Sequence, residues 1–200
     1  MPANFCLSCG HALDIREISG IGRRVCPACG FIFWGYYSMG VGAIVLKGDA
    51  LLLVRRSEEP GKGYWTIPGG YCEQNEPIEV TVEREVREET GIIAHAARIV
   101  AIRDRPDSIH NLYVAFAMDY VDGDPVPDGV EVDRADFFTR EQMASLRIAG
   151  LTKWLAEVAF SCENAGLTAD ESPFVSKTVN SLFRTARASR LDVSSRENPT

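Results

Sequence analysis

GYCEQNEPIEVTVEREVREETGI, residues 70–92, is the stretch of sequence that decides the fold. Proline suits the first position of a helix, where no backbone donor is needed, so we expect a helix to begin at Pro77. Gly91 is placed to end it in the left-handed conformation that glycine adopts most easily. One side of the predicted helix is apolar and should pack on a sheet. That side carries Ile78, Val80, Val82 and Val86.

The second half of this predicted helix carries a dense group of carboxylates. Glu85, Glu88 and Glu89 are spaced at i, i+3 and i+4, so all three project from one face. Like charges at this spacing repel one another, and a hard divalent cation such as Mg²⁺ or Mn²⁺ is a natural partner for their oxygens. The alternative is a solvated helix face on which Arg84 and Arg87 neutralise the glutamates.

The residues around this helix resemble one family closely. Glycines, glutamates and an Arg-Glu pair recur at the spacing of the Nudix box, and the preceding GYWTIPGG (residues 63–70) resembles the segment that usually leads into it. The sequence therefore resembles the Nudix hydrolases. The fixed positions that match are Gly70, Glu76, Arg84, Glu85, Val86, Glu88, Glu89, Gly91 and Ile92.

This resemblance implies both a fold and a chemistry. The fold is of the α/β class, a Nudix-type α/β/α sandwich. The box forms a loop–helix–loop that binds Mg²⁺ or Mn²⁺ and cleaves a diphosphate linkage. The implied ligands of the catalytic metal are the Gly69 carbonyl and the carboxylates of Glu85, Glu88 and Glu89, joined by Glu131 from a loop before the final strand.

The resemblance also implies supporting roles. Arg84 orients the glutamates rather than binding metal, and Glu76 pairs within the loop–helix–loop. Asp133 is the alternative to Glu131 as the loop carboxylate. The residue that activates water stays open between Glu85 and the loop acid. His95 and His110 are interpreted as structural or peripheral.

Four cysteines near the N-terminus form two CxxC pairs, Cys6 with Cys9 and Cys26 with Cys29. Their spacing fits a tetrahedral Zn²⁺ site with four thiolate ligands, which is closed and structural. A disulfide is disfavoured where thiols stay reduced, and the duplicated arrangement disfavours a redox CxxC. The sequence therefore predicts a small zinc ribbon that needs its metal to fold.

The chain divides into three parts. Residues 1–36 form the predicted zinc ribbon, residues 37–165 the Nudix domain, and residues 166–200 a tail rich in Ser, Thr, Arg and Asn. Apolar runs between turn signals predict strands at 41–46, 50–55, 92–103, 112–121 and 136–138, a short helix from 139 and another over 151–162. The tail is interpreted as one amphipathic helix followed by a disordered end. The apolar positions of that helix are Phe174, Val175, Val179, Leu182 and Phe183.

Composition limits the classes of partner. An apolar content of 46% supports a true core, and 21 Lys and Arg against 28 Asp and Glu give a net charge of −7. Such a charge argues against a protein that coats nucleic acid, but bound metal allows a nucleotide substrate. We find no signal peptide and no apolar run of membrane length, so a cytoplasmic protein is expected. The expected partner is a small-molecule nucleotide, with neither nucleic acid nor membrane, and the family suggests a possible homodimer.

The combination of ribbon and box narrows the substrate. The NADH pyrophosphatases carry a serine-glutamine-proline-tryptophan motif after the box, and residues 101–107 (AIRDRPD) lack it. The chain resembles more closely the FAD and ADP-ribose pyrophosphatases that carry a zinc ribbon, which implies hydrolysis with release of AMP. The alternatives are an NADH or nucleoside triphosphate pyrophosphatase, or a nucleotide-sensing module without catalysis. Aromatic residues at 31–37, or Tyr64 and Trp65, are candidates to stack on a base. For the residues at 31–37 the favoured alternative is an interface between the ribbon and the main domain.

Overall fold

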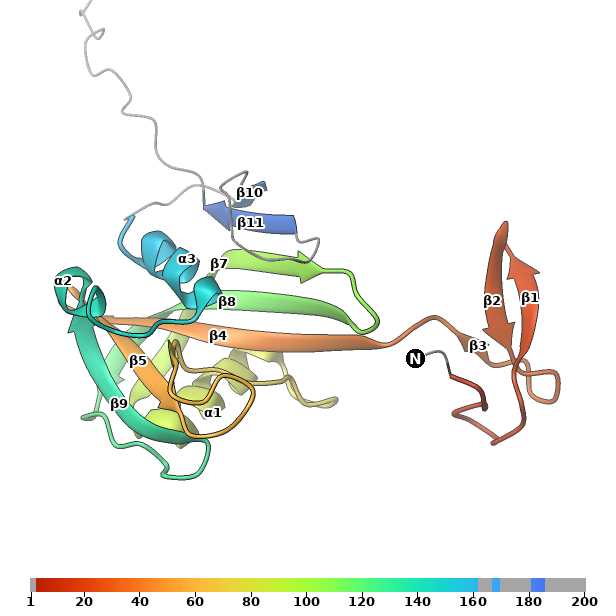
Figure 1. Cartoon of the computed structure of the whole chain (residues 1–200), viewed down its shortest axis with the longest axis horizontal. Coiled ribbons are helices and arrows are strands. Elements are labelled where there is room, and N and C mark those ends of the chain that lie inside the picture. The colour runs from red at the N-terminus through yellow and green to blue at the C-terminus, as the bar shows by residue number, and fades with distance from the viewer. Residues whose placement is uncertain (1–2, 162–166, 170–180, 186–200) are drawn as a thin grey trace, which may run out of the picture.

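The computed structural model of the chain describes residues 3–161, 167–169 and 181–185. Figure 1 shows a large sheet with helices on both faces and a small ribbon beside it. The ribbon strands are β1 (Asp14–Ile18), β2 (Ile21–Val25) and β3 (Ile32–Phe33). The remaining strands are β4 (Tyr37–Lys47), β5 (Ala50–Arg56), β6 (Trp65–Thr66), β7 (Ile93–Arg105), β8 (His110–Asp122), β9 (Val132–Thr139), β10 (Leu167–Ala169) and β11 (Ser181–Thr185). The helices are α1 (Ile78–Thr90), α2 (Arg140–Met143) and α3 (Gly150–Ala159).

The large sheet is mixed, with strand order β10-β11-β7-β8-β4-β5-β6 and with β9 paired to β5. β4 and β8 run parallel along most of their length, and β7 forms a long antiparallel pair with β8. β5 pairs with β4 only next to the turn that joins them, at Leu46↔Leu51 and Lys47↔Ala50. The rest of that edge of β4 is not paired with β5. The segment 68–72 forms hydrogen bonds to it instead.

The core lies on both faces of the sheet. On one face, Val82 and Val86 of α1 are fully buried against β4 and β8. On the other face, Trp154 and Leu155 of α3 pack with Trp65 and the opposite side of the sheet. The predicted α/β/α sandwich is confirmed. None of the described helices combines the length and the apolar character that crossing a bilayer requires.

Local sequence signals set the ends of the helices, with one correction. Pro77 has a ψ of 142° and is the N-cap of α1, so the helix begins one residue later than predicted. Gly91 caps the helix as expected, with a φ of 70° and its N–H donated to the Arg87 carbonyl. Thr139 and Gln142 form the predicted capping box at the start of α2. Val80 is 47% exposed, so it is not one of the packing positions.

Several strands differ from their predicted extent. β7 continues to Arg105 and β8 begins at His110, so the predicted loop at 104–111 is much shorter. β9 begins at Val132 rather than Asp136, because it pairs with β5 along its length. In the tail, Leu182 and Phe183 lie in strand β11 and not in the predicted helix. The other residues of that predicted helix lie outside the described residues.

The aromatic residues at 31–37 do not form one stacking surface. Phe31 and Phe33 pack on the small core of the ribbon, and Phe33 contacts Tyr36 edge to face at 4.8 Å between ring centroids. The Arg23 guanidinium lies over Trp34. Tyr37 instead begins β4 and stacks on a ring of β8. These rings therefore support the ribbon and its junction with the main domain.

Candidate functional site

The Pro68–Gly70 segment lies against β4 and reaches α1. The Ala43 N–H donates to the Pro68 carbonyl at 2.8 Å, and the Val41 N–H donates to the Gly70 carbonyl at 2.9 Å. Gly69 has a φ of 151°, and a Cβ there would lie 2.1 Å from the Val41 carbonyl oxygen. Only glycine fits this approach. The Gly69 carbonyl accepts no hydrogen bond from any described residue, so it remains available to a ligand.

Glu89 brings a buried carboxylate to this segment. Its side chain is 7% exposed, and its Oε2 accepts the Gly69 N–H at 2.9 Å. Burial and the nearby charges of Glu85, Glu131 and Asp128 together raise the pKa of Glu89 to about 8, against the lowering effect of the Gly69 amide. A buried carboxylate facing other carboxylates is stabilised when a cation binds among them.

Arg84 lies between three glutamates. Its Nη1 contacts Glu85 Oε1 at 3.0 Å and Glu88 Oε2 at 2.9 Å, while its Nη2 contacts Glu76 Oε2 at 3.0 Å. The Glu88 side chain is 59% exposed, against 14% for Glu85. The three glutamates predicted on one face therefore differ: Glu85 and Glu89 turn inward, and Glu88 stays at the surface.

Gly70 leaves the space that the Glu85 carboxylate occupies. A Cβ at Gly70 would lie 2.5 Å from Cδ and Oε1 of Glu85. Gly70→Ala should therefore move the Glu85 carboxylate and reduce kcat/KM by about 10²-fold, the effect expected for a displacement on the order of 1 Å. The thermal midpoint should change little, because the flexible carboxylate can move away. Activity within a few-fold of the unsubstituted protein would show that Glu85 need not occupy this position.

Glu131 and Asp133 have different surroundings. The Asp133 carboxylate accepts hydrogen bonds from both Nε and Nη2 of Arg55 at 2.7 Å, and this ion pair lowers the pKa of Asp133. The Glu131 carboxylate has no hydrogen bond or ion pair with any described residue, yet its charge acts on both Glu85 and Glu89. The geometry therefore favours Glu131 over Asp133 as the free carboxylate near the cluster.

Asp128 shapes the loop that carries Glu131, a role not found from the sequence. Its carboxylate accepts the backbone N–H groups of Val130, Glu131 and Val132 at 2.9, 3.3 and 3.0 Å. Burial opposes ionisation of Asp128, but these three N–H groups prevail and lower its pKa. An aspartate followed by residues of a tight turn is the signal that would have indicated this.

The residues around Gly69 fit a hard divalent cation. They offer oxygen donors of the type that Mg²⁺ and Mn²⁺ prefer: the carbonyl of Gly69 and the carboxylates of Glu85 and Glu89. The oxygens are not tightly clustered, because among the described residues only the cysteines bring three or more metal-ligating side chains within 4.8 Å of one another. The contact of Arg84 with Glu85 and Glu88 keeps part of the carboxylate set together.

The four cysteines converge as their spacing predicts. The Sγ atoms of Cys6, Cys9, Cys26 and Cys29 lie within 4.8 Å of one another, with contacts of 3.4–3.6 Å. Tetrahedral Zn–S bonds of about 2.3 Å place sulfurs on the order of 3.8 Å apart, so the set fits zinc. Burial opposes ionisation of Cys26, but the N–H groups of Cys29 and Ala28 lower its pKa to about 6. The His11 N–H lowers the pKa of Cys9, but the neighbouring sulfurs of Cys29 and Cys26 raise it to about 12.

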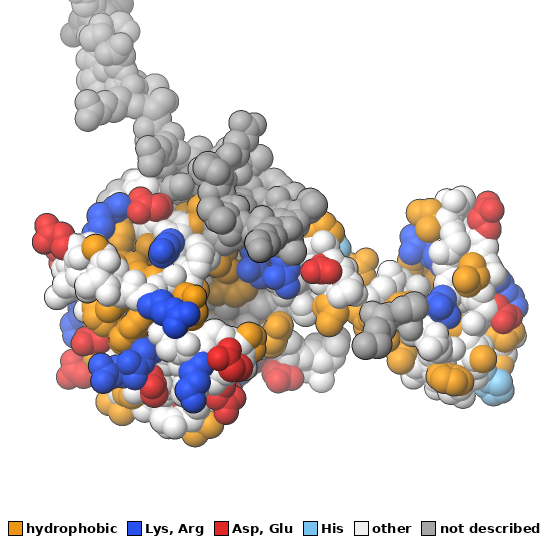
Figure 2. Space-filling view, viewed as in Figure 1, with side chains coloured by type: hydrophobic (Ala, Val, Ile, Leu, Met, Phe, Trp, Pro, Cys, Tyr) orange, Lys and Arg blue, Asp and Glu red, His pale blue; other side chains and the backbone are white. Residues whose placement is uncertain are grey.

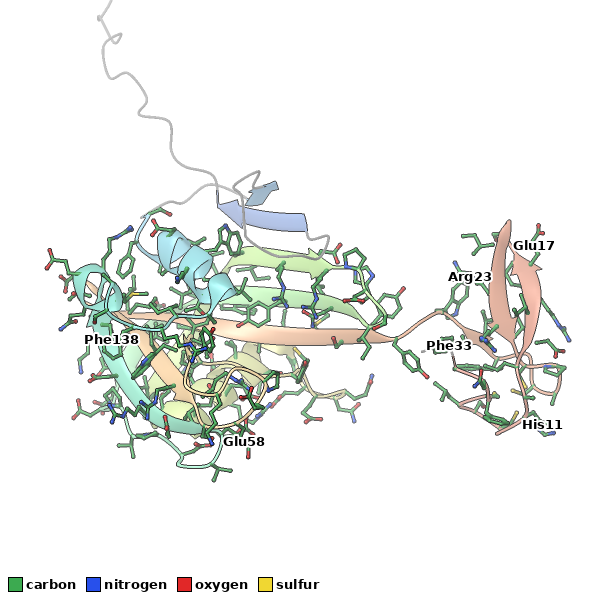
Figure 3. The ribbon with its side chains drawn as sticks, viewed as in Figure 1. His11, Glu17, Arg23, Phe33, Glu58 and Phe138 are labelled. Atoms are coloured by element: carbon green, nitrogen blue, oxygen red, sulfur yellow. The ribbon has the colours of Figure 1, made fainter. Side chains whose placement is uncertain are left out.

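Other residues named from the sequence lie elsewhere. His95 contacts Glu83 on the outside of α1, and the His110 Nε2 contacts Asp104. Trp65 is buried against Phe138 in the core, so it offers no stacking face. His11, which was not predicted, lies 3.5 Å from Cys9 Sγ through its Nδ1. Figure 3 shows His11 at the same end of the ribbon as the sulfur atoms.

Comparison with protein families agrees with this geometry. Residues 37–159 match the model described as NUDIX domain. The chain belongs to the Nudix family. The predicted membership is thereby confirmed, and the match begins at the first residue of β4.

Relatives of this Nudix protein include enzymes with different substrates. It is 34% identical over 142 residues to the NAD-capped RNA hydrolase NudC of Stutzerimonas stutzeri (strain A1501), a match covering 71% of this chain and 50% of the relative. It is 30% identical over 112 residues to the ADP-ribose pyrophosphatase of Methanocaldococcus jannaschii, covering 54% of this chain and 66% of the relative. The chain thus spans only half to about two thirds of these relatives.

A solved structure gives the same fold. The crystal structure of a NUDIX hydrolase from Nitrosomonas europaea superimposes with a TM-score of 0.67 at 25% identity, over 78% of this chain and 90% of that chain. The overall fold is therefore similar to that of an experimentally determined NUDIX hydrolase.

Proposed function

We propose that this Nudix protein is a metal-dependent pyrophosphatase that cleaves a nucleoside diphosphate linked to a second moiety, with FAD or ADP-ribose favoured, and that it releases AMP. The observation that carries the proposal is the approach of the Pro68–Gly70 segment to Glu85 and Glu89. It brings together the Gly69 carbonyl, which has no hydrogen-bond partner among the described residues, the buried carboxylate of Glu89 and the largely buried carboxylate of Glu85. A module that only senses a nucleotide does not need this combination.

The chain offers a complete set of roles for this reaction. Gly69, Glu85, Glu88, Glu89 and Glu131 would hold Mg²⁺ or Mn²⁺. The metal supplies charge neutralisation and polarisation of the phosphoryl oxygens. Arg84 orients the glutamates through its contacts on α1.

Hydrolysis requires a water molecule, and the chain has two carboxylates suited to orient it. The water oxygen bonds to phosphorus as the bridging P–O bond breaks, the bridging oxygen leaves with the other phosphate, and the proton of the water passes to a carboxylate. Burial raises the pKa of Glu85, which favours proton uptake there, while the Glu131 carboxylate has no hydrogen bond or ion pair with any described residue. Glu85 and Glu131 are therefore the two alternatives for this step.

The substrate preference rests on two observations. One relative is named as an ADP-ribose pyrophosphatase, and residues 101–107 lack the motif expected of NADH pyrophosphatases. An ADP group supplies a bridging diphosphate and leaves as AMP when the second moiety departs. Four thiolates at zinc spacing support a structural Zn²⁺ in the ribbon, away from this chemistry.

A substrate panel tests the proposal. In the presence of Mg²⁺ or Mn²⁺, FAD or ADP-ribose should exceed both NADH and ATP in kcat/KM, with AMP among the products. Contacts to the second moiety, which ATP lacks, can then contribute to transition-state binding. A tenfold advantage of NADH or ATP, about 1.4 kcal/mol of differential transition-state binding, would overturn the preference and leave the Nudix activity intact.

A second candidate is hydrolysis of an NAD-linked substrate. The relative from Stutzerimonas stutzeri is named as an NAD-capped RNA hydrolase, at a higher identity than the ADP-ribose pyrophosphatase. NAD-capped RNA therefore belongs in the same panel beside NADH. If kcat/KM for hydrolysis of the NAD cap of RNA exceeds kcat/KM for hydrolysis of ADP-ribose, this candidate is selected. That result would also correct the expectation that no nucleic acid binds.

A further inference from the structure

The α3 face of the sheet carries a pair of arginines at its end nearer the ribbon. Strand pairing aligns side chains in rows across β7, β8 and β4, and paired residues share a face. Two such rows run Arg103–Tyr113–Gly40 and Arg105–Asn111–Ser38. The next row, Ala101–Ala115–Gly42, begins the core under α3. Figure 2 shows Lys or Arg side chains gathered on this face over β7, beside a hollow in the surface.

Arg103 is held in place by its neighbours. Its Nη2 donates to Asn111 Oδ1, and the Asn111 amide donates to Ser38 Oγ at 2.9 Å. This chain of hydrogen bonds crosses three strands, and Asn111 is only 6% exposed. The guanidinium lies 5.3 Å from the centroid of the Tyr113 ring. Contacts within the sheet therefore hold the Arg103 side chain in one conformation, unlike an arginine that extends freely into solvent.

Neither arginine has a negative partner in the described part of the chain. The Nε atoms of Arg103 and Arg105 are both buried without a hydrogen-bond acceptor. Asp104, the acid between them in sequence, pairs with His110 instead. Burial, together with the like charge of Arg105, lowers the pKa of Arg103. Two unpaired guanidinium donors side by side are costly unless an anion with several oxygens binds to them.

The buried Tyr113 side chain lies between these arginines and the Gly69 segment of the carboxylate site. A Cβ at Gly42 would lie 1.9 Å from the Tyr113 hydroxyl oxygen, and one at Gly40 would lie 3.1 Å from its ring. The Tyr113 ring therefore lies across β4 in the space that the two glycines leave, and Gly42 contacts Gly69 directly. Burial raises the pKa of Tyr113, the charge of Arg103 lowers it, and the charge of Glu89 raises it. Tyr113 therefore contacts Arg103 and also feels the charge of Glu89.

We propose that Arg103 and Arg105 form a phosphate-binding site that positions the substrate relative to Glu85 and Glu89. The phosphate is either one of the bridging diphosphate or an additional one on the 2′-oxygen of the adenosine ribose. Both present oxygens that match two guanidinium groups. The predicted effect of these arginines on catalysis rests on the proposed function. Their binding of phosphate does not.

The test uses two probes, ADP-ribose and ADP-ribose 2′-phosphate, with the full-length protein and its Arg103→Gln and Arg105→Gln variants. Dissociation constants are measured by calorimetry without divalent metal, and kcat and KM with Mg²⁺. Each variant should weaken binding by roughly tenfold to a hundredfold, as expected for loss of a charged hydrogen bond, and should raise KM more than it lowers kcat. An equal loss for both probes assigns the site to the bridging diphosphate, and a larger loss for the 2′-phosphate assigns it to the additional phosphate.

Arg98→Gln is the matched control, because Arg98 lies exposed on the same strand and carries the same charge. Its affinities should match those of the unsubstituted protein. Arg105→Gln keeps the Arg103–Asn111 hydrogen bond, so it remains informative if Arg103→Gln is unstable. The inference is overturned if the unsubstituted protein binds neither probe, if both variants bind normally, or if Arg98→Gln loses as much affinity. Arginine-dependent binding without hydrolysis would support this site while contradicting the proposed function.

Discussion

Glu89→Gln should reduce turnover of the best substrate by about 10³-fold, roughly 4 kcal/mol of transition-state stabilisation, while leaving the fold intact. Glutamine has the same shape, and its carbonyl can still accept the Gly69 N–H that the carboxylate accepts at 2.9 Å. What the substitution removes is the negative charge inside the site. The measurement is kcat and KM at saturating Mg²⁺, together with thermal unfolding.

Stability should respond to Glu89→Gln in a pH-dependent way. The pKa of Glu89 is raised to about 8, so the folded protein binds a proton that the unfolded chain releases above its ordinary pKa of about 4.3. In metal-free protein, stability is therefore lost as pH rises through this window, and the glutamine variant escapes that loss. The variant should match or exceed the thermal midpoint of the parent at pH 8, and the difference should shrink near pH 4.

Glu79→Gln is the control for this experiment, because Glu79 is exposed in the first turn of the same helix. It should leave turnover unchanged. Near-normal turnover in folded Glu89→Gln would remove the buried carboxylate from the mechanism.

Cys26→Ser should remove zinc from the protein and unfold the ribbon. Cys26 is 1% exposed, and its thiol belongs to the cluster of four. Structural zinc contributes on the order of 10 kcal/mol to folding of such small units, so losing one ligand should destroy the ribbon. Zinc measured by elemental analysis should fall from one atom per chain to a trace, and hydrogen exchange in β1 and β2 should become fast.

Catalysis should be much less affected by this substitution, because the carboxylate site is built from other elements. We expect kcat to stay within about threefold of the parent. Cys72→Ser is the control, since Cys72 is partly buried beside α1 and lies outside the cysteine cluster. A parent protein that contains no zinc, or that contains a disulfide between these cysteines, would contradict the prediction.

Features that depend on neighbouring residues could be predicted from the sequence. The cap at Gly91 and the capping box of Thr139 rest on residues a few positions apart, and both are present. The cysteine cluster follows from two local turns with fixed spacing. The carboxylates of α1 share a face because helical geometry requires it.

Features that depend on distant pairing were missed. The first half of β9 is polar and reads as a loop, but its pairing with β5 makes it a strand. Arg105 was placed in a loop for the same reason, although β7 pairs through Arg105 with Asn111. Which glutamate of α1 is buried also depends on a distant segment, because Gly69 covers Glu89 and not Glu88.

The most direct test of the central claim is release of AMP from ADP-ribose and FAD by protein in metal-free buffer, before and after addition of Mg²⁺. The proposed site predicts AMP only after the metal is added, at a rate that saturates with metal concentration and is lost in Glu89→Gln. AMP release that is independent of added metal, or no AMP from either substrate with Mg²⁺ or Mn²⁺, would contradict it.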